Sequence, residues 1–184
     1  MSKVDEAKLL YIKNSGLETT EEGLVIFGSY EQDNNEENGK EKIEWIVLNV
    51  QDNRVLLMSK YCLDSKTIVG SYRNDVVWEN SDLYEWLNTE FVENAFSAEE
   101  KNSISKEVTL LTSTELNEFY RIRDVKTGVF TRYGQARSMT AGINGETGWW
   151  LKGEGDYVNC EGVEGYTGPN KPCGVRPVIW IDLS

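Results

Sequence analysis

The side chains of this sequence that could act as nucleophiles or soft metal ligands are three cysteines, and no histidine accompanies them. Cys160 and Cys173 fall in one glycine-rich stretch, Cys62 lies far upstream, and no CxxC pair is present. The lack of histidine excludes Ser-His-Asp and Cys-His catalysis and His-ligated zinc. Because no histidine or evident cation would activate a thiolate, we do not expect Cys160 and Cys173 to be a catalytic pair. Whether they form a disulfide stays open.

A second set of side chains has the composition of an adaptable binding surface, in which tyrosine and asparagine are favoured. The set runs from a double tryptophan to the last strand, and most of it lies in connections where side chains are presented without regular packing. Its members, which we predict to be the ligand-binding residues, are Trp150, Lys152, Tyr157, Asn159, Glu161, Asn170 and Arg176. The alternative for the tyrosine, the two asparagines and the glutamate is that they are solvated loop residues.

Two members of this set have a specific structural alternative. Trp149 and Trp150 point to opposite faces of a strand, so one is core and the other is either exposed for stacking or also buried in a central strand. Arg176 lies in an apolar strand, where an unpaired charge is costly. It is expected either to pair with a carboxylate such as Asp182 or a loop acid, or to anchor an anion on the displayed face.

Oxygen ligands for a metal are abundant, but none has a recognisable spacing. Asp33, Glu36 and Glu37 share an acidic loop without an EF-hand pattern, and Gly168-Pro169-Asn170 lacks the glutamate of the Glu-Pro-Asn motif of calcium-binding lectins. Carboxylates are so numerous that no glycosidase pair can be singled out. We therefore expect no metal and no cofactor.

Composition sets the class of protein. A chain of 184 residues with 39% hydrophobic residues and six tryptophans suits one folded domain. The net charge of -12 disfavours nucleic acid as a partner and leaves open an acidic decoy that binds a basic protein. The chain has no apolar leader and no run of membrane-spanning length, which predicts a cytoplasmic protein without a membrane partner, or an extracellular one if a leader has been removed.

The periodicity predicts an α+β order of elements. A helix over 4–14 that stops at Gly16 would make residues 1–20 an N-terminal extension, and residues 21–184 would form a single domain. Capping signals predict helices that begin near Ser81, Ser97 and Thr112. Strands are expected at 23–30, 43–50, 55–59, 108–111, 148–152, 156–160 and 174–182.

The last of these strands is the one from which the arrangement of the sheet is predicted. Residues 174–182 are apolar on both faces, so the strand must return into a core built earlier, with 43–50 as the expected partner. Residues 43–50 are apolar on both faces too and should form a central strand, joined to 55–59 by a tight turn at Asp52-Asn53. Ten of the sixteen glycines lie between Gly134 and Gly174, which predicts a long irregular region before the closing strand. Core tryptophans are expected at 45, 86 and 180.

Seven stretches, in order, resemble a bacterial family catalogued as domain of unknown function 6273. They are Ile26–Gln32, Ile43–Leu48, Val55–Asp64, Trp78–Asn88, Ala95–Glu100, Trp149–Leu151 and Gly174–Ile181, and together they span about residues 24–183. The family reads WWLRSPG after the double tryptophan. This chain has Lys152 in place of the arginine and lacks the serine-proline pair, so its loop is expected to differ.

The family looks like relatives of the C-type-lectin-like and formylglycine-generating-enzyme-like folds. The resemblance implies a compact antiparallel sheet with the N- and C-terminal strands paired, two flanking helices and a glycine-rich region that carries the binding surface. It implies no known activity. We therefore predict a non-enzymatic binding module that engages a protein or glycan through residues 149–173. The alternatives are a carboxylate- or thiol-based enzyme and the acidic decoy.

Overall fold

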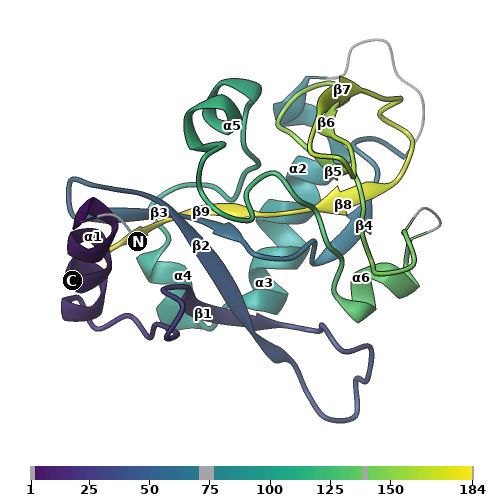
Figure 1. The fold of residues 1–184 in the computed structure, drawn as a ribbon. Coiled ribbons are helices and arrows are strands. Elements are labelled where there is room, and N and C mark those ends of the chain that lie inside the picture. The colour runs from purple at the N-terminus through teal and green to yellow at the C-terminus, as the bar shows by residue number, and fades with distance from the viewer. Residues whose placement is uncertain (1–2, 71–76, 139–140, 184) are drawn as a thin grey trace.

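The computed structural model describes residues 3–70, 77–138 and 141–183 and has an α+β architecture. Its main sheet is antiparallel and curled, with the strand order β1-β2-β3-β9 (Figure 1). The strands are Val25–Tyr30 (β1), Glu41–Gln51 (β2), Arg54–Ser59 (β3) and Val178–Asp182 (β9).

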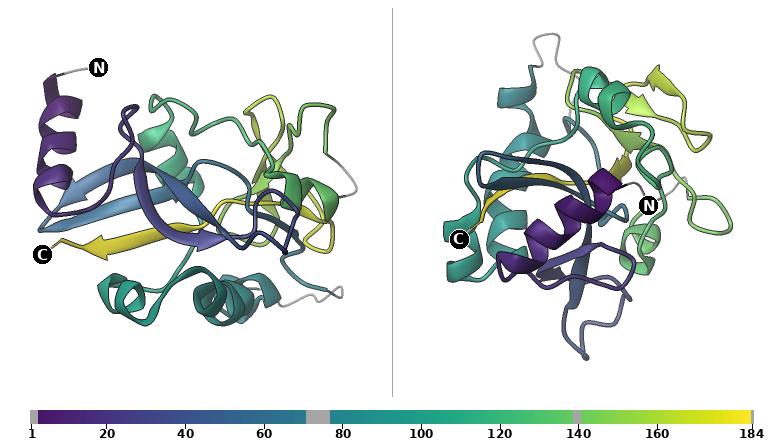
Figure 2. Two further views of the ribbon diagram at one scale, coloured as in Figure 1. Left: turned by 90° about the horizontal axis from the view of Figure 1, so that it is seen from below. Right: turned by 60° about the vertical axis from the view of Figure 1, so that its left-hand side comes forward.

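A second sheet of short strands has the order β4-β8-β5-β6-β7. These strands are Asp64–Lys66 (β4), Trp149–Trp150 (β5), Asp156–Val158 (β6), Glu164–Tyr166 (β7) and Cys173–Val175 (β8). Strand β5 is parallel to β8, and the other pairings are antiparallel. This sheet lies at the opposite end of the molecule from the first helix and the end of β9 (Figures 1 and 2). The glycine-rich region thus contributes four short strands rather than loops alone.

Helices cover both faces of the main sheet. They are Lys3–Asn14 (α1), Asp82–Trp86 (α2), Val92–Ala95 (α3), Ala98–Ser103 (α4), Ser113–Phe119 (α5) and Arg132–Ala136 (α6), with a 3-10 turn at Trp78–Asn80 (η1) and a π-helical turn at Leu87–Phe91 (η2). Helices α2 to α4 lie on one side of the sheet and α5 on the other (Figure 2). Among the described residues, no helix is both long and apolar enough to cross a membrane.

The predicted capping signals are present at the helix starts. Ser81 is the N-cap of α2, and its hydroxyl accepts a hydrogen bond from the Tyr84 amide. Ser97 and Glu100 form a reciprocal capping box at α4, and Thr112 and Glu115 form one at α5. Each box satisfies two backbone N–H groups that the first turn of a helix leaves unpaired, which is why these helices begin where the sequence indicates.

Strand β2 is central, as its two apolar faces predict. Trp45 is fully buried in a core shared with α2, η2, α3 and Trp150, whereas Ile46 and Leu48 belong to a second core shared with α5 and Trp149. Trp86 is also buried, but Trp180 is only partly so, and the guanidinium of Arg54 lies over its ring. The main sheet is thus sandwiched between two apolar layers.

Closure of the sheet by β9 is confirmed, with one correction to its neighbour. Strand β9 pairs antiparallel with β3, not with residues 43–50, because β2 already has β1 on one side and β3 on the other. Consequently β1, the N-terminal strand, and β9 lie at opposite edges, and the expected pairing of N- and C-terminal strands is wrong. The expected strand 108–111 is reduced to one bridge, between Thr109 and Val178 on the free side of β9.

A candidate ligand-binding pocket beside strands β5, β6 and β8

A pocket of about 760 Å³ opens beside the second sheet. Its lining comes from the segment before β5, from β6 and the turn after it, and from the segment that leads into β8. The lining residues are Gly142, Glu146, Thr147, Gly148, Tyr157, Asn159, Cys160, Thr167, Lys171, Pro172 and Cys173. Its volume lies within the range of about 300–1,000 Å³ found for small-molecule sites.

Tyr157 is placed in the pocket by two glycines on neighbouring strands. Within the sheet it pairs with Trp150 of β5 and Gly165 of β7. A Cβ atom added to Gly148 or to Gly165 would lie 3.1 Å from a carbon of the Tyr157 ring. The Trp150 ring meets the Tyr157 ring edge-on, with centroids 6.5 Å apart. The tyrosine ring therefore fills space that side chains would otherwise take on both adjacent strands.

Asn159 shapes the rim through the turn between β6 and β7. Its side-chain oxygen accepts hydrogen bonds from the amides of Glu161 and Val163, both 2.9 Å long. These bonds close the turn, in which Gly162 has a φ of 79°. The amide nitrogen of the Asn159 side chain donates to no other described residue, so it remains available to the pocket.

Two opposite charges line the pocket. The Glu146 carboxylate accepts from the side-chain amide of Asn144 at 3.0 Å and from its backbone amide at 3.2 Å. The hydrogen bond from the Asn144 side chain is the main cause of the lowered pKa of Glu146. Lys171 is exposed, and no carboxylate of the described residues lies within ion-pair distance of its ammonium group.

Both cysteines of the glycine-rich region line this pocket, as free thiols. Cys160 is exposed, whereas Cys173 is buried and its burial raises the pKa of its thiol to about 11. Lys171 opposes that shift only weakly, because desolvation is the larger effect. At neutral pH the Cys173 sulfur is therefore protonated and a poor nucleophile.

The other predicted binding residues do not line the pocket. Trp150 is fully buried, like Trp149, and its indole N–H donates to the Lys66 carbonyl at 2.8 Å. The alternative in which both tryptophans are core therefore holds, and Trp150 is not displayed for stacking. Lys152 lies 3.7 Å from a carboxylate oxygen of Glu79. Glu161 and Asn170 are exposed beside the pocket but outside its lining.

Arg176 has neither of the two surroundings expected from the sequence. It is fully buried, so it cannot anchor an anion at the surface, and no described carboxylate lies within ion-pair distance of it. Asp182 instead stands opposite Arg54 at the far end of β9. The guanidinium donates to the backbone carbonyls of Ser59, Lys60, Asp124, Val125 and Thr127. Arg176 is thus a structural residue that holds two loops together.

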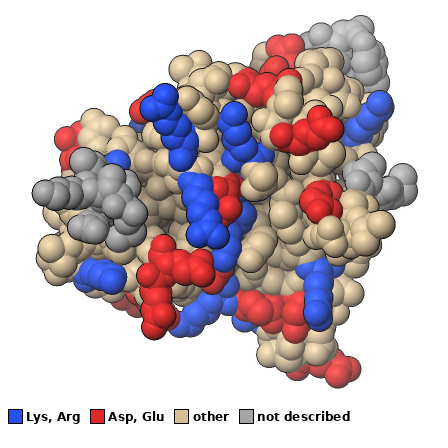
Figure 3. Space-filling model, viewed as in Figure 1, with Lys and Arg blue, Asp and Glu red and all other residues tan. Residues whose placement is uncertain are grey.

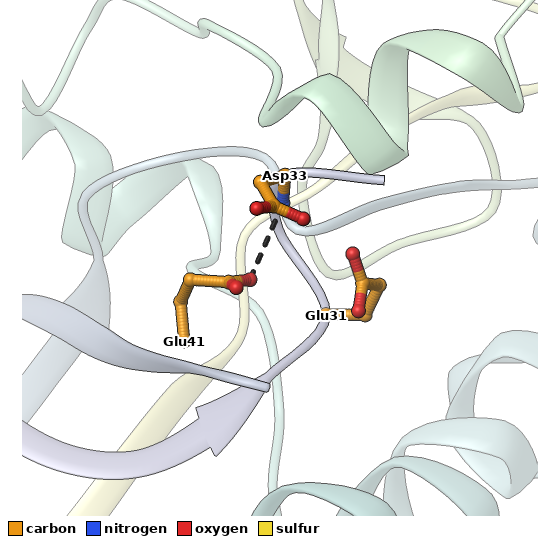
Figure 4. A group of neighbouring side chains, drawn as sticks. All are labelled: Glu31, Asp33 and Glu41. Carbon is orange, nitrogen blue, oxygen red and sulfur yellow. Dashed lines mark hydrogen bonds between the residues drawn. The ribbon is translucent and has the colours of Figure 1, made fainter. Parts of the chain in front are cut away.

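A cluster of acids lies elsewhere, where the loop after β1 meets the start of β2. Oxygen atoms of Glu31, Asp33 and Glu41 lie within 4.8 Å of one another (Figure 4). Each carboxylate bonds to its own loop: Glu41 accepts from the Asp33 amide at 3.2 Å, Glu31 from the Asn35 amide at 2.9 Å, and Asp33 from the Asn38 side chain at 2.7 Å. Of the three acids of this loop that the sequence offers as oxygen donors, Asp33, Glu36 and Glu37, only Asp33 is in the cluster. The three carboxylates thus accept hydrogen bonds that hold the loop in its conformation, which accounts for their proximity.

The described residues on the face of the molecule seen in Figure 3 form no continuous acidic patch. In Figure 3, lysine and arginine side chains alternate with aspartate and glutamate across the molecule. A decoy for a basic protein would favour one continuous acidic surface, and this face does not have it.

Sequence reasoning found Tyr157 and Asn159 but missed most of the remaining lining. These residues come from three irregular segments with no shared periodicity: Glu146 and Thr147 from one, Thr167 from the second and Lys171 from the third. The available signal was a pair of glycines: Gly165, which pairs with Tyr157, and Gly148, two residues before the Trp150 that pairs with Tyr157 on its other side. Only the pairing of β5, β6 and β7 makes that relation visible.

The comparison with protein families gives a match to part of the chain. Residues 52–131 match the family model described as Domain of unknown function (DUF6273), which confirms the resemblance over that segment. The segment runs from the turn between β2 and β3 to the start of α6, and every lining residue of the pocket lies outside it. Comparison with curated proteins and with solved structures found no match.

Proposed function

The chain carries a segment of the DUF6273 family, whose function is unknown, and we propose that it is a non-enzymatic binding protein. The pocket bounded by β5, β6 and β8 takes a small organic ligand. The observation that carries this proposal is that the predicted residues Tyr157 and Asn159 line one pocket of about 760 Å³. Pockets of that size with an aromatic side chain and a few polar groups are typical of small-molecule sites.

The chemistry of the lining favours binding over catalysis. A general acid or base needs a pKa near the working pH, and the lining contains no histidine. The pKa of Glu146 is lowered, so this group is ionised and cannot donate a proton at neutral pH. The pKa of the Cys173 thiol is raised to about 11, which opposes nucleophilic attack. The polar groups are instead arranged to orient a bound molecule.

Cys160 offers a direct test, because it is exposed on the rim while Cys62 and Cys173 are buried. The rate at which Ellman's reagent modifies Cys160 is measured with millimolar monosaccharides, amino acids, nucleosides and aromatic acids. We expect at least one of these compounds to slow the modification and to raise the melting temperature. A ligand seated in the pocket would do both.

Two matched substitutions locate the effect. Thr167→Trp fills the pocket, whereas Thr114→Trp adds the same side chain at an exposed position of α5, outside the lining. Protection of Cys160 should be retained in T114W and lost in T167W. The proposal is wrong if no compound protects Cys160, or if protection survives in a folded T167W protein.

A further inference from the structure

The orientation of Tyr157 indicates what kind of molecule the pocket takes, provided that the pocket binds a ligand as proposed above. Its ring lies close to the backbone of two neighbouring strands, at Gly148 on one side and Gly165 on the other. The buried Trp150 ring packs against it, with an angle of 66° between the two ring planes. A ring held in this way is a rigid platform, and its half-exposed part lines the pocket. Flat platforms of this kind stack on the apolar face of a ring-shaped ligand.

The free polar groups of the pocket are mainly hydrogen-bond donors. The Tyr157 hydroxyl, the Asn159 side-chain amide, the Thr167 hydroxyl and the Lys171 ammonium have no hydrogen-bond partner among the described residues. The Glu146 carboxylate, by contrast, already accepts two bonds from Asn144. These four donor groups come from three segments, because Tyr157 and Asn159 share one, and they match a ligand with several acceptor oxygens around its ring. A sugar ring meets this condition, whereas an aromatic acid carries its acceptors at one point only.

The unpaired charge of Lys171 adds one more requirement. Lys171 has no carboxylate of the described residues within ion-pair distance, although the chain has 31 acidic residues and only 19 basic ones. An ammonium group at the rim of a pocket binds a ligand carboxylate through charge-assisted hydrogen bonds. We infer that the pocket takes a hexuronic acid, with its pyranose ring stacked on Tyr157 and its carboxylate on Lys171.

The inference is tested with D-glucuronate and D-galacturonate against D-glucose, D-galactose and benzoate. Affinity is measured by calorimetry and by protection of Cys160. We expect at least one hexuronate to bind about tenfold more tightly than its neutral hexose, since a charge-assisted contact contributes on the order of 1.5 kcal/mol. Benzoate should bind more weakly than either sugar class. Equal binding of hexuronate and hexose would overturn the assignment of the carboxylate to Lys171.

Substitutions test the contact of the carboxylate with Lys171 and the contact of the ring with Tyr157 one at a time. Lys171→Met should weaken hexuronate binding about tenfold more than hexose binding and so remove the preference for hexuronate, whereas Lys152→Met, outside the lining, should change neither. Tyr157→Leu should weaken all sugars at least tenfold, while Tyr157→Phe, which keeps the ring, should retain most of the binding. Tyr166→Leu, on the neighbouring strand and outside the lining, is the control for the aromatic change.

The outcomes distinguish this inference from the proposal on which it rests. If an amino acid, a nucleoside or benzoate protects Cys160 and no sugar does, the pocket is a binding site but the sugar assignment is wrong. If no compound protects Cys160, both fail. A melting temperature within a few degrees of the parent protein is required of each variant, and Tyr157→Phe keeps the test valid if Tyr157→Leu does not fold.

Discussion

The guanidinium carbon of Arg176 lies 5.1 Å from the centre of the Trp149 ring, and both side chains are fully buried. The indole face stabilises the cation from one side, and five backbone carbonyls accept its N–H groups from the others. The positive charge of Arg176 is therefore stabilised by backbone carbonyl dipoles rather than by a carboxylate of the described residues. This arrangement joins β8 and β9 to the loops at 59–60 and 124–127.

Replacing Arg176 should destabilise the fold severely. Arg176→Met leaves several buried carbonyls without donors, and we expect it to lower the free energy of unfolding by about 3–5 kcal/mol. Arg176→Lys restores the charge but not the planar arrangement of donors, and should cost about 2–3 kcal/mol. Urea unfolding measures both. Arg123→Met, at a side chain that is 86% exposed, is the control, and an equal loss in the two methionine variants would contradict the assigned role.

Alkaline pH should destabilise the protein through Cys62. Burial raises the pKa of this thiol from 9.0 to about 12, and the nearby Arg176 only partly offsets the shift. Between these values the unfolded chain releases the proton and the folded chain keeps it, so stability falls as pH rises. Below pH 9 the contribution is fully present. We expect this thiol to add about 1.4 kcal/mol per pH unit to the slope above pH 9.

The measurement is urea unfolding at several pH values under reducing conditions. Cys62→Ala should make the decline with pH shallower, whereas Cys160→Ala, at an exposed thiol, should leave it as in the parent protein. A parallel decline in all three proteins would show that other groups cause the alkaline loss.

Gly28 should be far less tolerant of substitution than Gly39, although both have left-handed backbone conformations, with φ values of 69° and 88°. A Cβ atom at Gly28 would lie 2.6 Å from the Phe96 ring and 2.7 Å from the Ala95 carbonyl oxygen, whereas at Gly39 nothing lies within 4 Å. Gly39→Ala should cost about 1 kcal/mol from backbone strain alone. Gly28→Ala should cost at least about 2 kcal/mol more because of overpacking. Similar melting temperatures for the two variants would refute this difference.

Replacing Asp64 of the second sheet should lower the free energy of unfolding. Its buried carboxylate accepts from the Tyr30 hydroxyl at 3.1 Å and from Nε of Arg137 at 3.2 Å, which ties β4 to β1 and to the end of α6. Burial is the main cause of the raised pKa of Tyr30, and the Asp64 charge adds to it. Asp64→Asn should cost about 2–3 kcal/mol, because it removes the buried carboxylate that accepts from Tyr30 and Arg137 and lies 3.6 Å from the Lys66 ammonium.

A double-mutant cycle with Arg137→Met checks this prediction. The coupling energy should be below about 1 kcal/mol, because the Arg137 side chain is 48% exposed and solvent screens the pair. Asp182→Asn, at the exposed end of β9, is the matched control. A loss in D64N no larger than in D182N would show that the buried carboxylate contributes little.

The turns, helix starts and central strand could be predicted because each depends on residues close together in the sequence. Asp52 and Asn53 have φ values of 48° and 62°, as a tight turn between β2 and β3 requires, and both residue types tolerate them. The capping boxes at Ser97 and Thr112 depend on residues three apart. The two apolar faces of β2 predict a central strand because successive side chains point to opposite faces.

The remaining features depend on long-range packing that local patterns do not contain. The apolar pattern of β9 shows that it is buried but not which edge it joins, and that edge is decided by β1 and β3 flanking β2. The surroundings of Arg176 come from loops more than 45 residues away, so its carbonyl partners could not be named. Tyr157 and Asn159 were found because they share one short segment, whereas Glu146 and Lys171 reach the pocket through separate turns.

The pairing of β9 with β3 also fixes an order of events during synthesis. Four strands make the main sheet, and three of them have been synthesised by residue 59, but the fourth follows more than a hundred residues later. Until residues 178–182 emerge, the nascent chain carries an apolar strand with one unpaired edge, which is the kind of surface that chaperones recognise and that promotes aggregation. The main sheet can therefore close only after residues 178–182 have been synthesised.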